Sequence, residues 1–221
     1  MRRTSSRGQQ MPPVFDDRFE HAFETLLHWR RDVRRFREEP LAAGLLDKLL
    51  DLADLAPSVG NSQPWRVVLV EDAARRDKIV AGFEAENRAA LETYETDKAA
   101  LYARLKLAGL REAPVHLAVF CDCETAQGHG LGRRTMPETL QYSVVGMIQT
   151  LWLAARIHGV GIGWVSIVDP VAVHDTLDVP ADWQLVAYLC VGYPQEEHID
   201  PELEREGWQG RTPLSTRIFR R

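Results

Sequence analysis

Residues 138–158 have the sequence ETLQYSVVGMIQTLWLAARIH, in which apolar side chains recur every three or four positions. That period is typical of an α-helix, because residues three and four apart lie on one helix face. Apolar residues also occupy most of the other positions, so the helix is predicted to be buried on several sides, through the centre of a domain or across a dimer interface. The main apolar face consists of Leu140, Val144, Ile148, Leu151 and Ala155.

Strands are predicted on both sides of this helix along the chain. Residues 66–71 (RVVLVE) and 114–120 are largely apolar runs bounded by turn-forming residues, which is typical of buried strands. The glycine-rich GVGIGWVSIV, residues 159–168, predicts a turn and a strand, and residues 184–191 predict another strand. Helices and strands do not alternate regularly, which argues against a doubly wound parallel sheet and for an α+β fold.

The chain is predicted to form one domain, because it has neither an internal repeat nor a linker rich in Gly, Ser or Pro. That domain covers residues 16–221 and follows a flexible leader at residues 1–15. Within it, the polar, Ala-rich region 84–110 is expected to form a lid over the site. The aperiodic region 193–221 is expected to be an extended tail that wraps over something else.

The composition argues against several classes of function. With 221 residues, 45% hydrophobic and 27% charged, the chain has the make-up of an ordinary globular protein. Its apolar runs are far shorter than the roughly 20 residues that cross a bilayer, so no membrane partner is expected. A net charge of −5 argues against general nucleic-acid binding. Three cysteines suit a reducing cytoplasm better than a disulfide framework, and no residue spacing indicates a metal site.

A basic cluster, RRDVRRFR at residues 30–37, follows a predicted amphipathic helix at residues 19–29. On a continuing helix, Arg30, Arg34 and Arg37 share one face, where three guanidinium groups converge on a single anion such as a phosphate. The alternative is a solvated basic end of the helix, which the helix dipole favours.

The segment APSVGNSQPW, residues 56–65, lies between a second predicted helix, residues 41–56, and the first strand. By composition it is a turn, but its hydroxyl and amide side chains suit the edge of a heteroaromatic ring. The glycines at residues 159–163 do not fit the dinucleotide-binding pattern, because a helix precedes them and a strand follows. They are expected to let a flat ligand approach the backbone, with Ser166 at the edge of that surface.

Together these motifs resemble the nitroreductase superfamily of FMN proteins, over most of residues 19–217. In that superfamily R-R-S-x-R opens the flavin site and S-x-x-N-x-Q-P-W follows one helix later. G-x-G-W-V and a late arginine, here Arg211, come after them. The resemblance implies a nitroreductase-like α+β fold with a mixed central sheet flanked by helices. It also implies an intertwined homodimer with two flavin sites at the interface.

Two positions depart from the nitroreductase pattern. Asp32 stands where a serine is usual, and Ser166 follows GWV at residues 163–165. This combination resembles the branch of the superfamily that consumes its own flavin. The implied reaction converts reduced FMN and dioxygen into 5,6-dimethylbenzimidazole, the lower-ligand base of cobalamin, and erythrose 4-phosphate. No metal is implied, and a flavin reductase is a candidate supplier of the reduced FMN.

The resemblance assigns catalysis to Asp32 and Ser166. A carboxylate flanked by arginines is expected to stay ionised at neutral pH, ready to accept a proton or to orient a ribityl hydroxyl. The residues expected to bind FMN are Arg30, Arg31, Arg34 and Arg211 at the phosphate and ribityl chain, Ser58, Asn61 and Gln63 at the ring and its side chain, Leu110 from the lid, and Asp32, Val33, Gly163 and Ser166.

Two other functions stay open from the sequence. The first is an NAD(P)H-dependent FMN nitroreductase or quinone reductase, in which the flavin stays bound. Such a shuttle needs an open flavin face, whereas a self-consuming reaction needs a closed pocket. The second is a non-catalytic module that binds an anionic partner, against which the acidic net charge counts.

Overall fold

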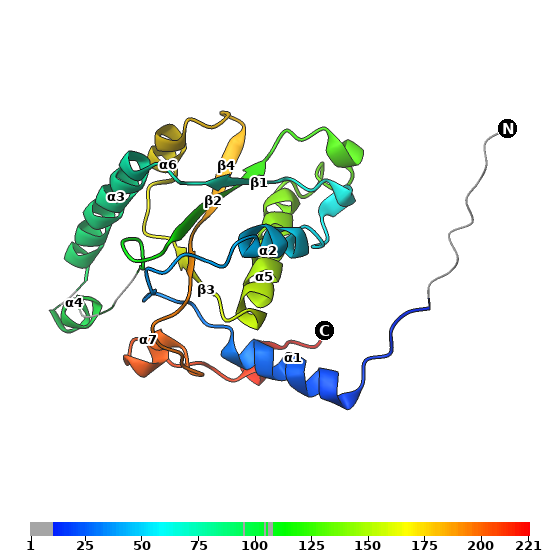
Figure 1. The fold of residues 1–221 in the computed structure, drawn as a ribbon, viewed down its shortest axis with the longest axis horizontal. Coiled ribbons are helices and arrows are strands. Elements are labelled where there is room, and N and C mark those ends of the chain that lie inside the picture. Colours follow the sequence, from blue (N-terminus) through cyan, green and yellow to red (C-terminus); the bar gives the residue numbers. More distant parts are fainter. Residues whose placement is uncertain (1–10, 95, 104, 106–107) are drawn as a thin grey trace.

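The computed structural model describes residues 11–94, 96–103, 105 and 108–221, so most of the predicted leader lies outside it. In these ranges four strands form one sheet in the order β1-β2-β4-β3, and each neighbouring pair is antiparallel (Figure 1). The two longest strands, β2 and β4, occupy its centre. The strands are β1 (Trp65–Leu69), β2 (Val115–Asp122), β3 (Gly161–Val165) and β4 (Trp183–Gly192).

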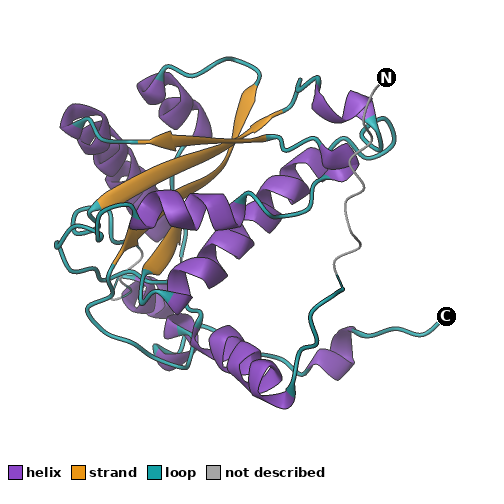
Figure 2. Cartoon of the chain, turned by 45° about the vertical axis from the view of Figure 1, so that its right-hand side comes forward, coloured by secondary structure: helices purple, strands orange, loops and turns teal. Residues whose placement is uncertain are grey.

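Helices cover both faces of the sheet (Figures 1 and 2). On one face α5 (Thr139–Ile157) and α2 (Leu45–Ala53) pack against the strands. On the other face lie α3 (Ala73–Glu92) and α6 (Pro170–Leu177). Because successive side chains of a strand point to opposite faces, the central strands contribute to two separate hydrophobic cores.

The remaining helices lie outside this layered core. They are α1 (Asp17–Trp29), α4 (Thr96–Tyr102) and the short α7 (Glu202–Arg205). The side chain of Asp16 caps α1 by accepting a hydrogen bond from the Phe19 N–H. Almost all of α1 is exposed, and its contacts are with α5. Within the described ranges, none of the helices combines the length and apolar content that a membrane crossing requires.

The α+β class and the nitroreductase-like arrangement are confirmed, and the predicted core elements are found within a few residues of their expected ends. The parallel component of the predicted mixed sheet is limited to an isolated bridge between Asp32 and Ile162. Helix α6 was not predicted. Asp169 caps it and Pro170 occupies its first turn, so the Asp-Pro pair is a local signal that would have found it.

The predicted lid and tail contact each other. Region 84–110 contains the end of α3 and all of α4, whose Tyr102 is buried. The ring of Trp208, from the tail, lies 5.5 Å from that of Tyr94 and 6.1 Å from that of Tyr102. The tail is largely irregular and includes α7 and a 3-10 turn at Leu214–Arg217.

Candidate active site

The arginine cluster is extended and not helical, so the prediction of a shared helix face is wrong. Helix α1 ends at Trp29, and Arg30 already has extended backbone angles. The Val33 N–H donates to the Ile162 carbonyl at 3.0 Å, because the segment runs beside β3 and pairs its backbone there rather than within a helical turn. Arg37 is consequently removed from the cluster, and its guanidinium stacks on Tyr193.

Glycines in β3 allow this close approach. A Cβ atom on Gly163 would collide with the Val33 carbonyl oxygen, and one on Gly161 would lie 2.6 Å from a Val33 methyl group. Val33 therefore occupies the space next to these two glycines, where the sequence predicts that a flat ligand approaches the backbone. The glycines position the arginine segment, and a contact of Gly163 or Val33 with FMN stays a prediction.

Asp32 is held from two directions. Its Oδ1 accepts a hydrogen bond from the Trp164 N–H at 2.9 Å, and its Oδ2 accepts one from Arg34 Nε at 2.8 Å. Burial raises the pKa of Asp32 above its ordinary value, while the bonds from Arg34 and Trp164 act in the opposite direction. The two donors fix the orientation of the carboxylate. Arg34 thus serves Asp32, in addition to any contact with the ligand.

Three of the predicted phosphate-binding arginines lie within electrostatic range of one another. The pKa of Arg30 is lowered by burial and also by the charge of Arg211, although Asp32 opposes this. The pKa of Arg31 is lowered by burial, then by Arg30 and Arg211. Guanidinium groups that destabilise one another's charge are the arrangement that a phosphate dianion would stabilise, so this cluster fits the phosphate of FMN.

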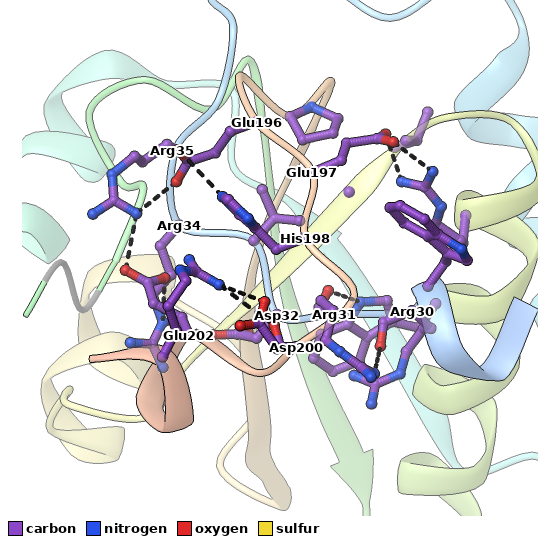
Figure 3. A pocket seen from close by; sticks show the side chains of 18 residues that line it. Arg30, Arg31, Asp32, Arg34, Arg35, Glu196, Glu197, His198, Asp200 and Glu202 are labelled. Carbon is purple, nitrogen blue, oxygen red and sulfur yellow. Dashed lines mark hydrogen bonds and ion pairs between the residues drawn. The ribbon is translucent and has the colours of Figure 1, made fainter. Parts of the chain in front are cut away.

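Acidic residues of the tail meet the same segment (Figure 3). Arg35 Nη1 lies 3.0 Å from a carboxylate oxygen of Glu196 and 2.9 Å from one of Glu202. The Arg31 Nε donates to the Ile199 carbonyl oxygen at 2.8 Å. The cleft between the segment and the tail has a volume of about 40 Å³. Ligand pockets measure roughly 300–1,000 Å³, so this cleft by itself does not enclose an isoalloxazine.

The predicted ring-binding residues form a second, separate cluster. The Ser58 Oγ accepts a hydrogen bond from the Gln63 N–H at 3.0 Å, and Asn61 is exposed in a left-handed backbone conformation. This turn is anchored near the start of α5, through Ser143. Arg30 instead stacks on Trp152, nine residues further along α5. At 1.5 Å per residue these two anchor points lie roughly 13 Å apart along the helix, so the two clusters are separate in this chain.

Ser166 and Leu110 differ in exposure. Ser166 is exposed directly after β3, two residues beyond the Trp164 N–H that binds Asp32. Leu110 is buried in the core cluster that includes Phe36, so a contact between its side chain and FMN stays a prediction. Among the described residues, no group of three or more His, Cys, Asp and Glu side chains could hold a metal ion.

The sequence profile of the Nitroreductase family matches residues 27–193, and the chain belongs to that family. A solved structure titled oxidized iodotyrosine deiodinase, bound to FMN and 3-iodo-L-tyrosine, is similar to it. The TM-score is 0.67 and the identity 27%, with 79% of this chain and 91% of that chain covered. Flavin binding is thus a property of its structural neighbours.

Two curated relatives are more similar in sequence. The 5,6-dimethylbenzimidazole synthase of Rhodospirillum rubrum is 59% identical over 201 residues, which cover 91% of this chain and 95% of that protein. The 5,6-dimethylbenzimidazole synthase of Rhodobacter capsulatus is 47% identical, with 90% and 96% covered. Both relatives have the name of the activity that the sequence resemblance implies.

Proposed function

We propose that the chain binds reduced FMN and converts it with dioxygen into 5,6-dimethylbenzimidazole and erythrose 4-phosphate. The observation that carries this proposal is the 59% identity to the Rhodospirillum rubrum synthase over 91% of the chain. The geometry supports it, because Asp32 is hydrogen-bonded to the strand that ends one residue before Ser166. A cytoplasmic location and independence from metals belong to the same proposal.

Some of the candidate residues bind FMN, and others take part in the reaction. Reduced FMN supplies the electrons that dioxygen accepts. Arg30, Arg31 and Arg211 bind its phosphate, where their mutual repulsion is relieved by the negative charge. Asp32, oriented by its two donors, accepts a proton from a ribityl hydroxyl or fixes that hydroxyl in place. Ser166 would face the bound flavin from the end of β3 and support its reaction with dioxygen.

The proposal includes a homodimer, because neither cluster is a complete flavin site. A second copy would bring its Ser58, Asn61 and Gln63 to the arginine segment and enlarge the cleft. Apolar side chains that are exposed to solvent on the single chain support this assembly. They lie on α1, on the outer side of α5 and on the tail, and include Phe19 at 50% exposure, Tyr142 at 58% and Phe219 at 73%.

The direct test mixes the purified protein with reduced FMN in air-saturated buffer and analyses the products by chromatography and mass spectrometry. We expect 5,6-dimethylbenzimidazole to accumulate as FMN disappears. A parallel reaction without protein measures simple reoxidation of the flavin. Steady oxidation of NADH with a nitroaromatic and no loss of flavin would instead identify a nitroreductase. Failure to bind FMN in either redox state would favour the anion-binding module.

The source of the reduced flavin needs a separate measurement. We propose that a flavin reductase supplies it. The reaction should therefore run when an unrelated reductase and NADH regenerate reduced FMN in the mixture. Product formation from oxidised FMN and NADH without added reductase would remove this partner from the proposal.

A further inference from the structure

Trp152 lies under the arginine segment and contacts it in two ways. This residue belongs to α5 and is 8% exposed. Its indole N–H donates a hydrogen bond of 3.2 Å to the carbonyl oxygen of Arg31. Its ring lies 4.9 Å from the guanidinium carbon of Arg30. One side chain thus holds both the backbone of Arg31 and the side chain of Arg30.

The ring stacking has a particular electrostatic effect. A carboxylate partner would hold Arg30 but cancel its charge, and the guanidinium would then attract a phosphate weakly. The face of an indole attracts the guanidinium through its quadrupole and leaves the net positive charge in place. It can therefore hold Arg30 near the like charge of Arg211 without neutralising it.

A second tryptophan extends the contact toward Asp32. The ring of Trp164 lies 6.4 Å from that of Trp152, and the backbone N–H of Trp164 binds the Asp32 carboxylate. The segment is therefore held both by Trp152 and by β3. Arg30 and Arg31 are fixed by the first, and Asp32 by the second.

We infer that Trp152 is a positioning residue, which orients Arg30 and the Arg31 backbone for the phosphate of the flavin. The inference rests on the proposed function, because it assumes that the anion bound is the FMN phosphate. It assigns to Trp152 a role in phosphate recognition that is separate from the chemistry at Asp32.

Riboflavin provides the test, because it has the same ring and ribityl chain as FMN but no phosphate. Binding of oxidised FMN and of riboflavin is measured by quenching of flavin fluorescence. We expect Trp152→Leu to weaken FMN binding about 10-fold, and Trp152→Phe, which keeps an aromatic face but loses the N–H, about 3-fold. The affinity for riboflavin should change less than about 2-fold in both variants, because the ring site is untouched.

The matched control is Trp183→Leu. Trp183 also stacks under an arginine, Arg66, but lies at the opposite end of β4 from the residues that pair with β3. Any change should affect FMN and riboflavin equally, because Arg66 donates a hydrogen bond to the Gln63 carbonyl oxygen in the proposed ring-binding turn. A double-mutant cycle adds specificity: in an Arg30→Gln background, Trp152→Phe should cost less FMN affinity than in the wild type, because a phenyl ring attracts the Arg30 guanidinium less strongly than an indole does.

The outcomes separate the inference from the proposed function. Equal loss of FMN and riboflavin affinity, or no loss of either, overturns the positioning role. If Trp152→Leu does not fold, the Phe variant and the cycle decide. A wild-type protein that binds riboflavin as tightly as FMN would contradict the phosphate site itself, and with it the proposed function.

Discussion

At the scale of single residues, two opposing effects act on the pKa of Asp32. Burial raises the pKa of this carboxyl, and the Arg34 guanidinium acts against that effect. The carboxylate form is the one that can accept a proton, so the acid limb of the reaction should report the titration of Asp32. One donor lies on each carboxylate oxygen, but burial outweighs them and raises the pKa, so ionisation of Asp32 at neutral pH stays a prediction.

Replacing Asp32 should stop the chemistry and leave binding. We expect Asp32→Asn to lower the rate of benzimidazole formation by about 10²- to 10⁴-fold, because the amide cannot accept a proton. Arg34→Gln should move the acid limb to higher pH, since removing the guanidinium raises the pKa of Asp32 further. Rates are measured between pH 5 and 9 at saturating reduced FMN. An Asp32→Asn variant with a normal rate would contradict the role.

Ser166 allows a similar separation of binding from chemistry. It is exposed at the end of β3, and no core packing depends on its hydroxyl group. We expect Ser166→Ala to bind FMN normally but to lower the yield of benzimidazole per FMN consumed. Quantifying product against lost flavin tests this. An unchanged yield would remove Ser166 from the mechanism.

At the scale of elements, β3 is the strand against which the arginine segment packs. Gly163→Ala would place a methyl group against the Val33 carbonyl oxygen. We expect it to cost about 1–3 kcal/mol of stability and to weaken FMN binding, because the segment must move away from the strand. Unfolding by urea and flavin titration measure both effects.

The matched control is Gly82→Ala in α3, where an added methyl group meets nothing within 4 Å. That change should stabilise the protein by roughly 0.5–1 kcal/mol, because alanine favours helices. Stable, tightly binding Gly163→Ala protein would show that the segment does not depend on this contact.

The central strands also contain a buried polar pair. His116 of β2 and Tyr188 of β4 are almost completely buried, and His116 Nδ1 lies 2.9 Å from the Tyr188 hydroxyl. Burial, with help from the charge of Arg76, lowers the pKa of His116 to about 4. The unfolded chain, with a histidine pKa near ~6.5, binds the proton first, so acid should destabilise the fold.

This loss should occur between the pKa of the unfolded state, about 6.5, and that of the folded state. Urea unfolding at pH 7, 6 and 5 is expected to show falling stability in the wild type. His116→Gln keeps a polar partner for Tyr188 but does not titrate, so its stability should fall less over the same range. An identical slope in both proteins would rule out His116 as the source.

At the scale of the whole molecule, the arginine cluster and the Ser58–Gln63 turn belong to different parts of one chain. The proposed homodimer makes a specific prediction about mixed assemblies. Arg30→Ala and Asn61→Ala chains are each expected to be inactive alone. If each site takes Arg30 from one copy and Asn61 from the other, a mixed dimer contains one intact site.

Co-expression of the two variants should then restore about a quarter of wild-type activity, because half of the dimers are mixed and each has one working site of two. Two differently tagged chains allow the mixed dimer to be isolated and assayed. A pairing of Arg30→Ala with Asp32→Asn provides the control, since both positions belong to one half-site. Absence of recovery in the first mixture would contradict the shared site.

Local patterns predicted much of this protein, because periodicity and residue type are properties of neighbouring residues. The helical repeat of α5, the strands of the sheet and the two binding strings are all contained in short stretches of the chain. The α+β class followed from them, whereas the candidate site residues were assigned by the resemblance of these strings to a known family and stay predictions. The Asp-Pro start of α6 is a local signal of the same kind.

The path of the arginine segment could not be obtained in that way. Trp152 binds the carbonyl of a residue 121 positions earlier, and Trp164 binds a carboxylate 132 positions earlier. Such contacts replace the helical hydrogen bonds that the local pattern favoured, because packing against β3 and α5 satisfies the same backbone groups elsewhere. Long-range packing therefore decides which charged side chains face each other and that the arginine cluster lies apart from the Ser58–Gln63 turn. No short stretch of the sequence contains that information.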